Sequence, residues 1–279
     1  MQAHTLHRRL CAWRACWALF RIRTAEGLQY RMAALASVSI SAFWALLEIT
    51  VYVVFYTYAD PSGAALTLTQ VITYAWLAQI MFPLQPMSID SEILESIQNG
   101  NVGLELCRPL DLYMHWFAKT AAGRIGGWWW RGVILLVLSV LMPAAYRLSA
   151  PASAASFAAF LLSMCSAFLL CASYGMLITT VRLGVTWGEG PSYVLLLIGG
   201  LLSGSYLPLQ LWPDAMQGIL RYQPFAGYLD LPLRLYLGLL PPGDAASVIA
   251  LQLGWAAAFI IAGRLLLRRR LRHLIVQGG

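Results

Sequence analysis

Six long apolar stretches divide this chain, and each is long enough to cross a membrane as a helix. They cover residues 32–58, 68–88, 126–146, 153–180, 188–207 and 245–266. The hydrocarbon core of a bilayer needs about 20 mostly apolar residues per helix, and these stretches are too long for barrel strands. The pattern predicts an all-α polytopic membrane protein with six transmembrane helices. A composition with 59% hydrophobic and 11% charged residues agrees.

The basic residues indicate on which side of the membrane the connecting segments lie. If six spans are counted, every Lys and Arg except Arg147, Arg221 and Arg234 falls on the side of the two termini. Lys and Arg accumulate in cytoplasmic segments, so both termini are expected in the cytoplasm. The net charge of +7 then lies at membrane edges beside lipid, and nucleic-acid binding is not expected. Arg14 interrupts the only earlier apolar stretch, so the first span is expected to remain as an uncleaved anchor.

Residues 1–31 precede the first span and show an amphipathic pattern over 5–24. The apolar stripe of this pattern consists of Leu6, Leu10, Trp13, Trp17 and Phe20. Aromatic residues on one face and arginines on the other are typical of a helix that lies in the membrane interface. Such a helix is either a simple anchor or a lever that passes force into the first span. Residues 32–279 then form one transmembrane domain.

The coupling segment, residues 89–111, differs from the basic cytoplasmic surface around it. Its charged residues are Asp90, Glu92, Glu95, Glu105 and Asp111, with Arg108 as the one base. Residues 91–97 can form a short helix, which Gly100 would end and Pro109 would prevent from continuing. A charged short helix beside membrane spans suits docking to a soluble partner. The alternative is a solvated loop whose acids avoid anionic lipid.

The prolyl segment, residues 208–240, is too apolar for a free external loop and too interrupted for one span. Its marked residues are Pro208, Pro213, Pro224, Phe225 and Pro232. Proline limits or breaks a helix, and interrupted helices at membrane depth are tolerated where protein buries them or where they line a cavity. We expect two short re-entrant or interfacial helices, around 214–222 and 226–238, that form an external gate.

Glu48 is the one acid that the sequence places well inside a predicted span. A charge in hydrocarbon is costly and usually faces the bundle interior or an aqueous cavity. Helical spacing puts four other residues on its face, namely Ser41, Trp44, Tyr52 and Phe55. An acid among aromatic rings suits a cationic, partly apolar substrate. The alternative is a structural carboxylic acid, protonated or hydrogen-bonded to a neighbouring helix.

No catalytic, metal or nucleotide site is expected in this chain. A phosphate-binding loop needs a glycine-rich turn that ends in Gly-Lys-Ser/Thr, but no such turn precedes Lys119, the only lysine. The cysteines and histidines show no metal-ligand spacing, and no nucleophile elbow is present. If transport uses ATP, a separate polypeptide must hydrolyse it.

Several features together resemble a type-2 permease of the ATP-binding-cassette transporter superfamily. They are the amphipathic N-terminal helix, the six spans, the acidic helix after the second span and the prolyl segment before the sixth. Residues 97–110 also look like the branch that includes viologen exporters, in which a glycine-containing turn leads into a Leu-x-Arg-Pro-Leu run. That run is residues 106–110 here.

The resemblance implies one half of an exporter in the inner membrane of a bacterium. It implies a second permease subunit, identical or paralogous, and a cytoplasmic ATPase dimer that binds ATP and Mg²⁺. The coupling segment would then dock to that ATPase. Two other classes stay open. An ion-driven secondary transporter should show inverted repeats and several buried ionisable groups, and a membrane scaffold would show no dependence on an ATPase.

Overall fold

The computed structural model describes residues 21–22, 25, 31–58, 65–86, 88–107, 111–183 and 190–272. Most of the expected interfacial helix over 5–24 therefore lies outside the described residues, as do Arg108 and Pro109 of the coupling segment. Within the described part of the chain the regular elements are all helices. This confirms the all-α class predicted from the sequence.

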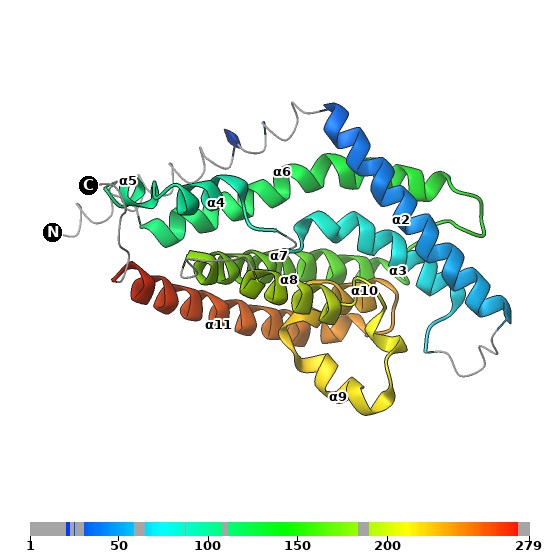
Figure 1. The fold of residues 1–279 in the computed structure, drawn as a ribbon. Coiled ribbons are helices and arrows are strands. Elements are labelled where there is room, and N and C mark those ends of the chain that lie inside the picture. The colour runs from blue at the N-terminus through cyan, green and yellow to red at the C-terminus, as the bar shows by residue number, and fades with distance from the viewer. Residues whose placement is uncertain are drawn as a thin grey trace.

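Long helices lie side by side in Figure 1 and alternate in chain direction. They are α2 (Arg31–Tyr58), α3 (Leu68–Met81), α6 (Leu112–Leu141), α7 (Ala154–Leu183), α8 (Gly190–Leu202) and α11 (Ala245–Leu271). Short helices fill two connections, namely α4 (Ser91–Gln98) and α5 (Val102–Leu106) after α3, and α9 (Asp214–Tyr222) and α10 (Asp230–Tyr236) after α8. The 3-10 turns are η2 (Phe82–Leu84), η3 (Leu209–Leu211), η4 (Pro224–Tyr228) and η5 (Pro242–Asp244).

Among the described residues, four helices are long and apolar enough to cross a membrane. They are Leu35–Tyr58, Leu112–Leu141, Ala154–Leu183 and Pro242–Leu271, and the shorter apolar helices are Leu68–Leu84 and Gly190–Leu202. The 13 residues of α8 rise about 20 Å, less than the hydrocarbon core of about 30 Å. The second and fifth predicted spans are therefore shorter than expected. In the second predicted span, Pro83 ends the regular helix α3. In the fifth, α8 stops before Gly204, whose φ is +87°.

Helix α7 lies at the centre of the bundle. In the most apolar stretch of α7, 44% of the residues are buried, against 22–28% in the other three helices that are long enough to cross a membrane. Small buried residues such as Ala159 and Ser163 let α10 and α11 approach it closely. Gln252 of α11 is fully buried, donates to the carbonyl of Gly227 at 2.9 Å and accepts from the Ser166 hydroxyl of α7. These contacts fix the prolyl segment against the bundle centre.

The two connections that carry short helices lie in different places. Figure 1 shows α4 and α5 at the end of the bundle where α6 begins and α11 ends, whereas α9 projects away from the bundle. A separate apolar cluster lies under α4 and α5, and it includes Ile93, Val102, Trp116, Met176 and Leu267. Helix α2 leans across α3 and α6 and exposes large apolar side chains such as Phe43 on its outer face. Such a face suits contact with lipid.

Candidate functional site

Helix α4 of the coupling segment begins and ends where its sequence predicts. The Asp90 carboxylate caps the helix by accepting from the backbone N–H groups of Glu92 at 3.1 Å and Ile93 at 3.2 Å. Gly100 follows the C-cap Asn99 with φ of +71°, a left-handed conformation that ends helices and favours glycine. The buried Ile93 anchors the helix to the cluster beneath it. The prediction of a short helix terminated by glycine is confirmed.

The acids of the coupling segment are used largely within the protein. The Glu92 carboxylate lies 3.2 Å from the Lys119 ammonium of α6, and Glu105 accepts from the Trp116 indole at 2.5 Å and from Ser96 at 3.4 Å. Asp111 caps α6 by accepting from the backbone N–H of Met114 at 2.8 Å. Glu95 is exposed. The local acidity of the segment predicted docking to a partner, but two of the five acids, Glu92 and Glu105, hold α4 and α5 onto α6, and two others, Asp90 and Asp111, cap helices.

Arg124 of α6 ties the bundle to the α4 linker, which we define as residues 85–90. Its guanidinium donates to the backbone carbonyls of Gln85 and, at 3.4 Å, Ser88. It passes Gly175 of α7 so closely that a Cβ there would lie 2.7 Å from its Nη2 atom. One side chain thus connects α6, α7 and the linker that carries α4. This contact could not be predicted from the sequence, because Arg124 looks like any other basic residue at a membrane edge.

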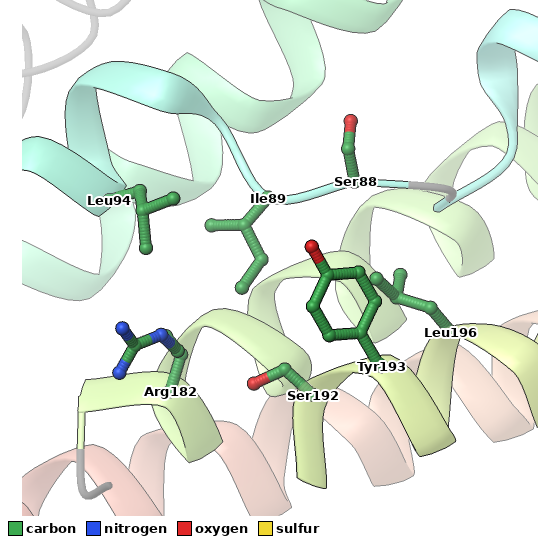
Figure 2. A pocket seen from close by; sticks show the side chains of 7 residues that line it. All are labelled: Ser88, Ile89, Leu94, Arg182, Ser192, Tyr193 and Leu196. Carbon is green, nitrogen blue, oxygen red and sulfur yellow. The ribbon is translucent and has the colours of Figure 1, made fainter. Parts of the chain in front are cut away.

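Two cavities lie on either side of the α4 linker. The smaller one, of about 130 Å³, is shown in Figure 2 and is lined by Ser88, Ile89, Leu94, Arg182, Ser192, Tyr193 and Leu196. In that view Ser88 and Ile89 of the linker face Tyr193 and Ser192 of α8, while Arg182 comes from the end of α7. The larger one, of about 430 Å³, lies between the linker, η2 and α6. The linker therefore has space on both flanks.

The face predicted around Glu48 is split in the structure. Ser41 is buried, and Glu48 and Tyr52 are half-buried, but Trp44 and Phe55 are 50% and 54% exposed. The Gln79 amide of α3 donates to Glu48 at 3.4 Å. The buried stripe of α2 runs through Val38, Ser41, Ala45 and Ile49. Trp44 and Phe55 lie outside this stripe, and their role beside Glu48 in a substrate pathway stays a prediction.

The first of the two short helices expected in the prolyl segment is present, and it has the predicted bounds. Helix α9 covers Asp214–Tyr222, starts after Pro213 and is mostly exposed. The second piece divides into η4, which begins at Pro224, and α10. Pro208 is buried before η3 and Phe225 is half-buried. Pro232 does not break a helix, since it is the third residue of α10, where a backbone N–H has no partner within the helix.

Comparison with known proteins identifies the family. Residues 40–278 match the family described as ABC-2 family transporter protein, which is most of the chain. The chain belongs to this family of transporter membrane components. Neither a curated protein nor a solved structure matches it. Membership supports an ABC-2 type permease subunit, and permeases of this family are normally non-catalytic.

Sequence reasoning missed a second buried acid of this ABC-2 family member. Asp230 of α10 is fully buried and pairs with the Arg234 guanidinium at 2.6 Å. The Tyr74 hydroxyl of α3 donates to the Gly204 carbonyl at 3.0 Å and lies 3.4 Å from Asp230. Burial raises the pKa of Asp230, while the positive charge and hydrogen bond of Arg234 act in the opposite direction. The Asp-x-x-x-Arg spacing, one helical turn, was the available signal.

Proposed function

We propose that this chain is the membrane-spanning subunit of an ATP-driven exporter. All six apolar helices would cross the membrane, with α3 and α8 as the shorter spans, and both termini would face the cytoplasm. The observation that carries the proposal is the platform of α4 and α5, which rests on α6 and is tied by Arg124 to α6 and α7. A force applied to this platform would reach two long helices directly. Membership of the ABC-2 family supports the same conclusion.

The energy source in this proposal is a separate cytoplasmic ATPase dimer. The chain lacks a phosphate-binding loop, so ATP and Mg²⁺ would be held by that partner. The surface offered to it consists of the exposed Glu95 with Leu104 and Leu106, which are 70% and 44% exposed on α5. Arg108 and Pro109, which follow in the sequence, are proposed as further residues that contact the ATPase. An acidic residue among apolar side chains suits a basic-rimmed apolar groove.

A second permease subunit, identical or paralogous, would complete the transporter in a bacterial inner membrane. The Leu-x-Arg-Pro-Leu run supports the viologen-exporter-like branch. Glu48 with Ser41 and Tyr52 is proposed to border the substrate pathway between the subunits. The prolyl segment is proposed as the external gate, with the exposed helix α9 as its moving part, since most of α10 is buried.

Charge reversal in the coupling segment tests the proposal. Glu95→Lys should weaken co-purification of the ATPase and lower transport-coupled ATP hydrolysis, while the stability of the chain is unchanged because Glu95 is exposed. Glu92→Lys should do the same and also lose its contact with Lys119, worth up to about 1 kcal/mol. Adding Lys119→Glu should restore that stability but not the coupling. Arg147→Glu is the matched control, because it reverses a charge at an exposed residue between α6 and α7, outside the coupling and prolyl segments.

The outcomes separate the three functional classes. Full coupled ATP hydrolysis in both Glu95→Lys and the Glu92→Lys/Lys119→Glu double variant would refute docking through the coupling segment. Transport that persists when the ATPase is blocked would indicate an ion-driven transporter. A chain that co-purifies with an ATPase but moves no substrate in reconstituted vesicles would indicate a scaffold.

A further inference from the structure

The larger cavity beside the α4 linker is lined by an unusual set of polar groups. Its lining residues include two arginines of α6, Arg124 and Arg131, together with Thr120 one turn before Arg124 and Gln85 at the start of the linker. Arg124 and Arg131 lie seven positions apart on one helix, which places them on the same face. Both guanidinium groups therefore border a space of about 430 Å³, far more than one water molecule occupies.

Several of these polar atoms lack hydrogen-bond partners among the described residues. They are the Gln85 Nε2, Thr120 Oγ1, Arg124 Nε and Arg131 Nε atoms. Gln85 and Thr120 are only 2% and 5% exposed, so solvent at the protein surface does not satisfy them. A buried polar group without a partner costs stability, and native structures normally satisfy such groups. Three of the four atoms are N–H donors and the fourth is a hydroxyl, so the missing partner is an acceptor. Each atom is enclosed by its neighbours, so an acceptor in the cavity reaches it only when the lining side chains shift.

The remaining contacts of the arginines leave their charge available to that acceptor. Arg131 donates to the Ser41 hydroxyl of α2 and lies over the Phe82 ring with its guanidinium carbon 5.8 Å from the ring centroid. Arg124 donates to two backbone carbonyls. These partners are neutral. Asp90 is the acid that lines the cavity. Its Oδ1 atom caps α4, and its negative charge also acts on Arg124, so Arg131 is the guanidinium whose charge is more available.

We propose that this cavity binds a phosphate group. A phosphate supplies several acceptor oxygens and a negative charge, which matches two guanidinium groups, a hydroxyl and an amide donor. The neighbouring tryptophans of α6, Trp129 and Trp130, are 51% and 39% exposed, and exposed tryptophans of this kind collect at the level of lipid headgroups. The headgroup of an anionic phospholipid and a soluble phosphoester share this chemistry. The site does not depend on the proposed exporter function.

Lipid titration of the full-length chain in detergent tests the site. Thermal unfolding is followed by tryptophan fluorescence while phosphatidylglycerol, diacylglycerol or glycerol phosphate is added. We expect phosphatidylglycerol to raise the unfolding temperature in a saturable way and diacylglycerol, which lacks phosphate, to have no such effect. Stabilisation by phosphatidylglycerol alone identifies a lipid headgroup, and stabilisation by glycerol phosphate as well identifies a soluble phosphoester. Equal effects of both lipids, or no effect of any compound, would overturn the proposal.

Two variants locate the binding. Arg131→Gln should weaken the apparent affinity for phosphatidylglycerol about tenfold, as expected for the loss of one charge-assisted hydrogen bond. Thr120→Val keeps the shape of the side chain and removes the orphan hydroxyl, so it should raise the unfolding temperature without lipid and reduce the further rise with lipid. Arg147→Gln is the control, since Arg147 is exposed in the connection between α6 and α7, beyond the far end of α6. Equal loss of affinity in Arg147→Gln and Arg131→Gln, or an unchanged lipid response in Thr120→Val, would place binding elsewhere.

Discussion

The coupling segment and the prolyl segment both join long helices through short ones, yet they are held in opposite ways. Helices α4 and α5 rest on α6 through partly exposed contacts, such as the pair of Glu92, whose side chain is 49% exposed, with Lys119. Helix α10 lies inside the bundle, where Asp230 and Arg234 form an ion pair. Exposed pairs are worth about 0–1 kcal/mol, whereas removing one partner of a buried pair costs about 3–5 kcal/mol.

This difference shows which parts of each connection can move. Elements held by few buried contacts open locally at low free-energy cost, and elements in a packed core move as one body with it. The polar contacts of the coupling platform can therefore open at low cost, while the buried Ile93 and Val102 keep the platform on α6. In the prolyl segment the same freedom is confined to α9, whose side chains are mostly exposed, whereas α10 follows α7 and α11.

The largest expected effect comes from breaking the buried pair. Asp230→Asn leaves the Arg234 charge unpaired and should destabilise the chain by about 3 kcal/mol, as measured by denaturant unfolding in detergent. Asp214→Asn, the same change on exposed α9, should have an effect within about 0.5 kcal/mol. In Asp230→Asn, a cysteine introduced by Leu233→Cys should become reactive to a membrane-impermeant thiol reagent. Equal stability of the two Asn variants would contradict the comparison.

A smaller effect is expected from filling the space that Arg124 uses. In Gly175→Ala the new methyl group displaces the guanidinium from the carbonyls of Gln85 and Ser88. Alanine gains about 1 kcal/mol as a helix former, which offsets much of the loss, so stability should fall by only about 1 kcal/mol. Hydrogen exchange in residues 85–91 should nevertheless become faster.

Gly218→Ala on α9 provides the matched control for that change. A Cβ at Gly218 meets no atom within 4 Å, so this variant should be stabilised by about 1 kcal/mol and leave exchange in the α4 linker unaltered. If Gly175→Ala also leaves the exchange of residues 85–91 unchanged, then Arg124 does not hold the linker.

The smallest expected effect on stability concerns Glu48, the acid with a neutral partner. Glu48→Gln can still accept from Gln79, so the free energy of unfolding should change by less than about 1 kcal/mol. If Glu48 borders the substrate pathway, export of cationic substrates should fall more than export of neutral ones. Gln79→Leu removes the hydrogen bond but keeps the charge, and it should not change this preference. Equal loss for both substrate classes in Glu48→Gln would indicate a structural carboxylate.

Local sequence signals predicted the elements well. The apolar stretches predicted the all-α membrane class, Gly100 predicted the end of the short helix α4, and Pro213 predicted the start of α9. Each of these features depends on residues within about one helical turn, so its physical cause is contained in the local sequence. The coupling segment was predicted to connect two spans, and Figure 1 shows its helices α4 and α5 at one end of the bundle.

Only the tertiary structure decided what the polar groups contact. Tyr74 and Asp230 lie 156 residues apart and meet because α10 packs beside α3, which no local pattern encodes. The buried stripe of α2 runs through Ser41, Ala45 and Ile49 because the neighbours of this helix, rather than its own sequence, set which of its apolar stripes is buried. The same holds for Arg124, whose carbonyl partners and clearance over Gly175 come from two other parts of the chain. Periodicity fixes which residues share a helix face, and the packing partner fixes which face is used.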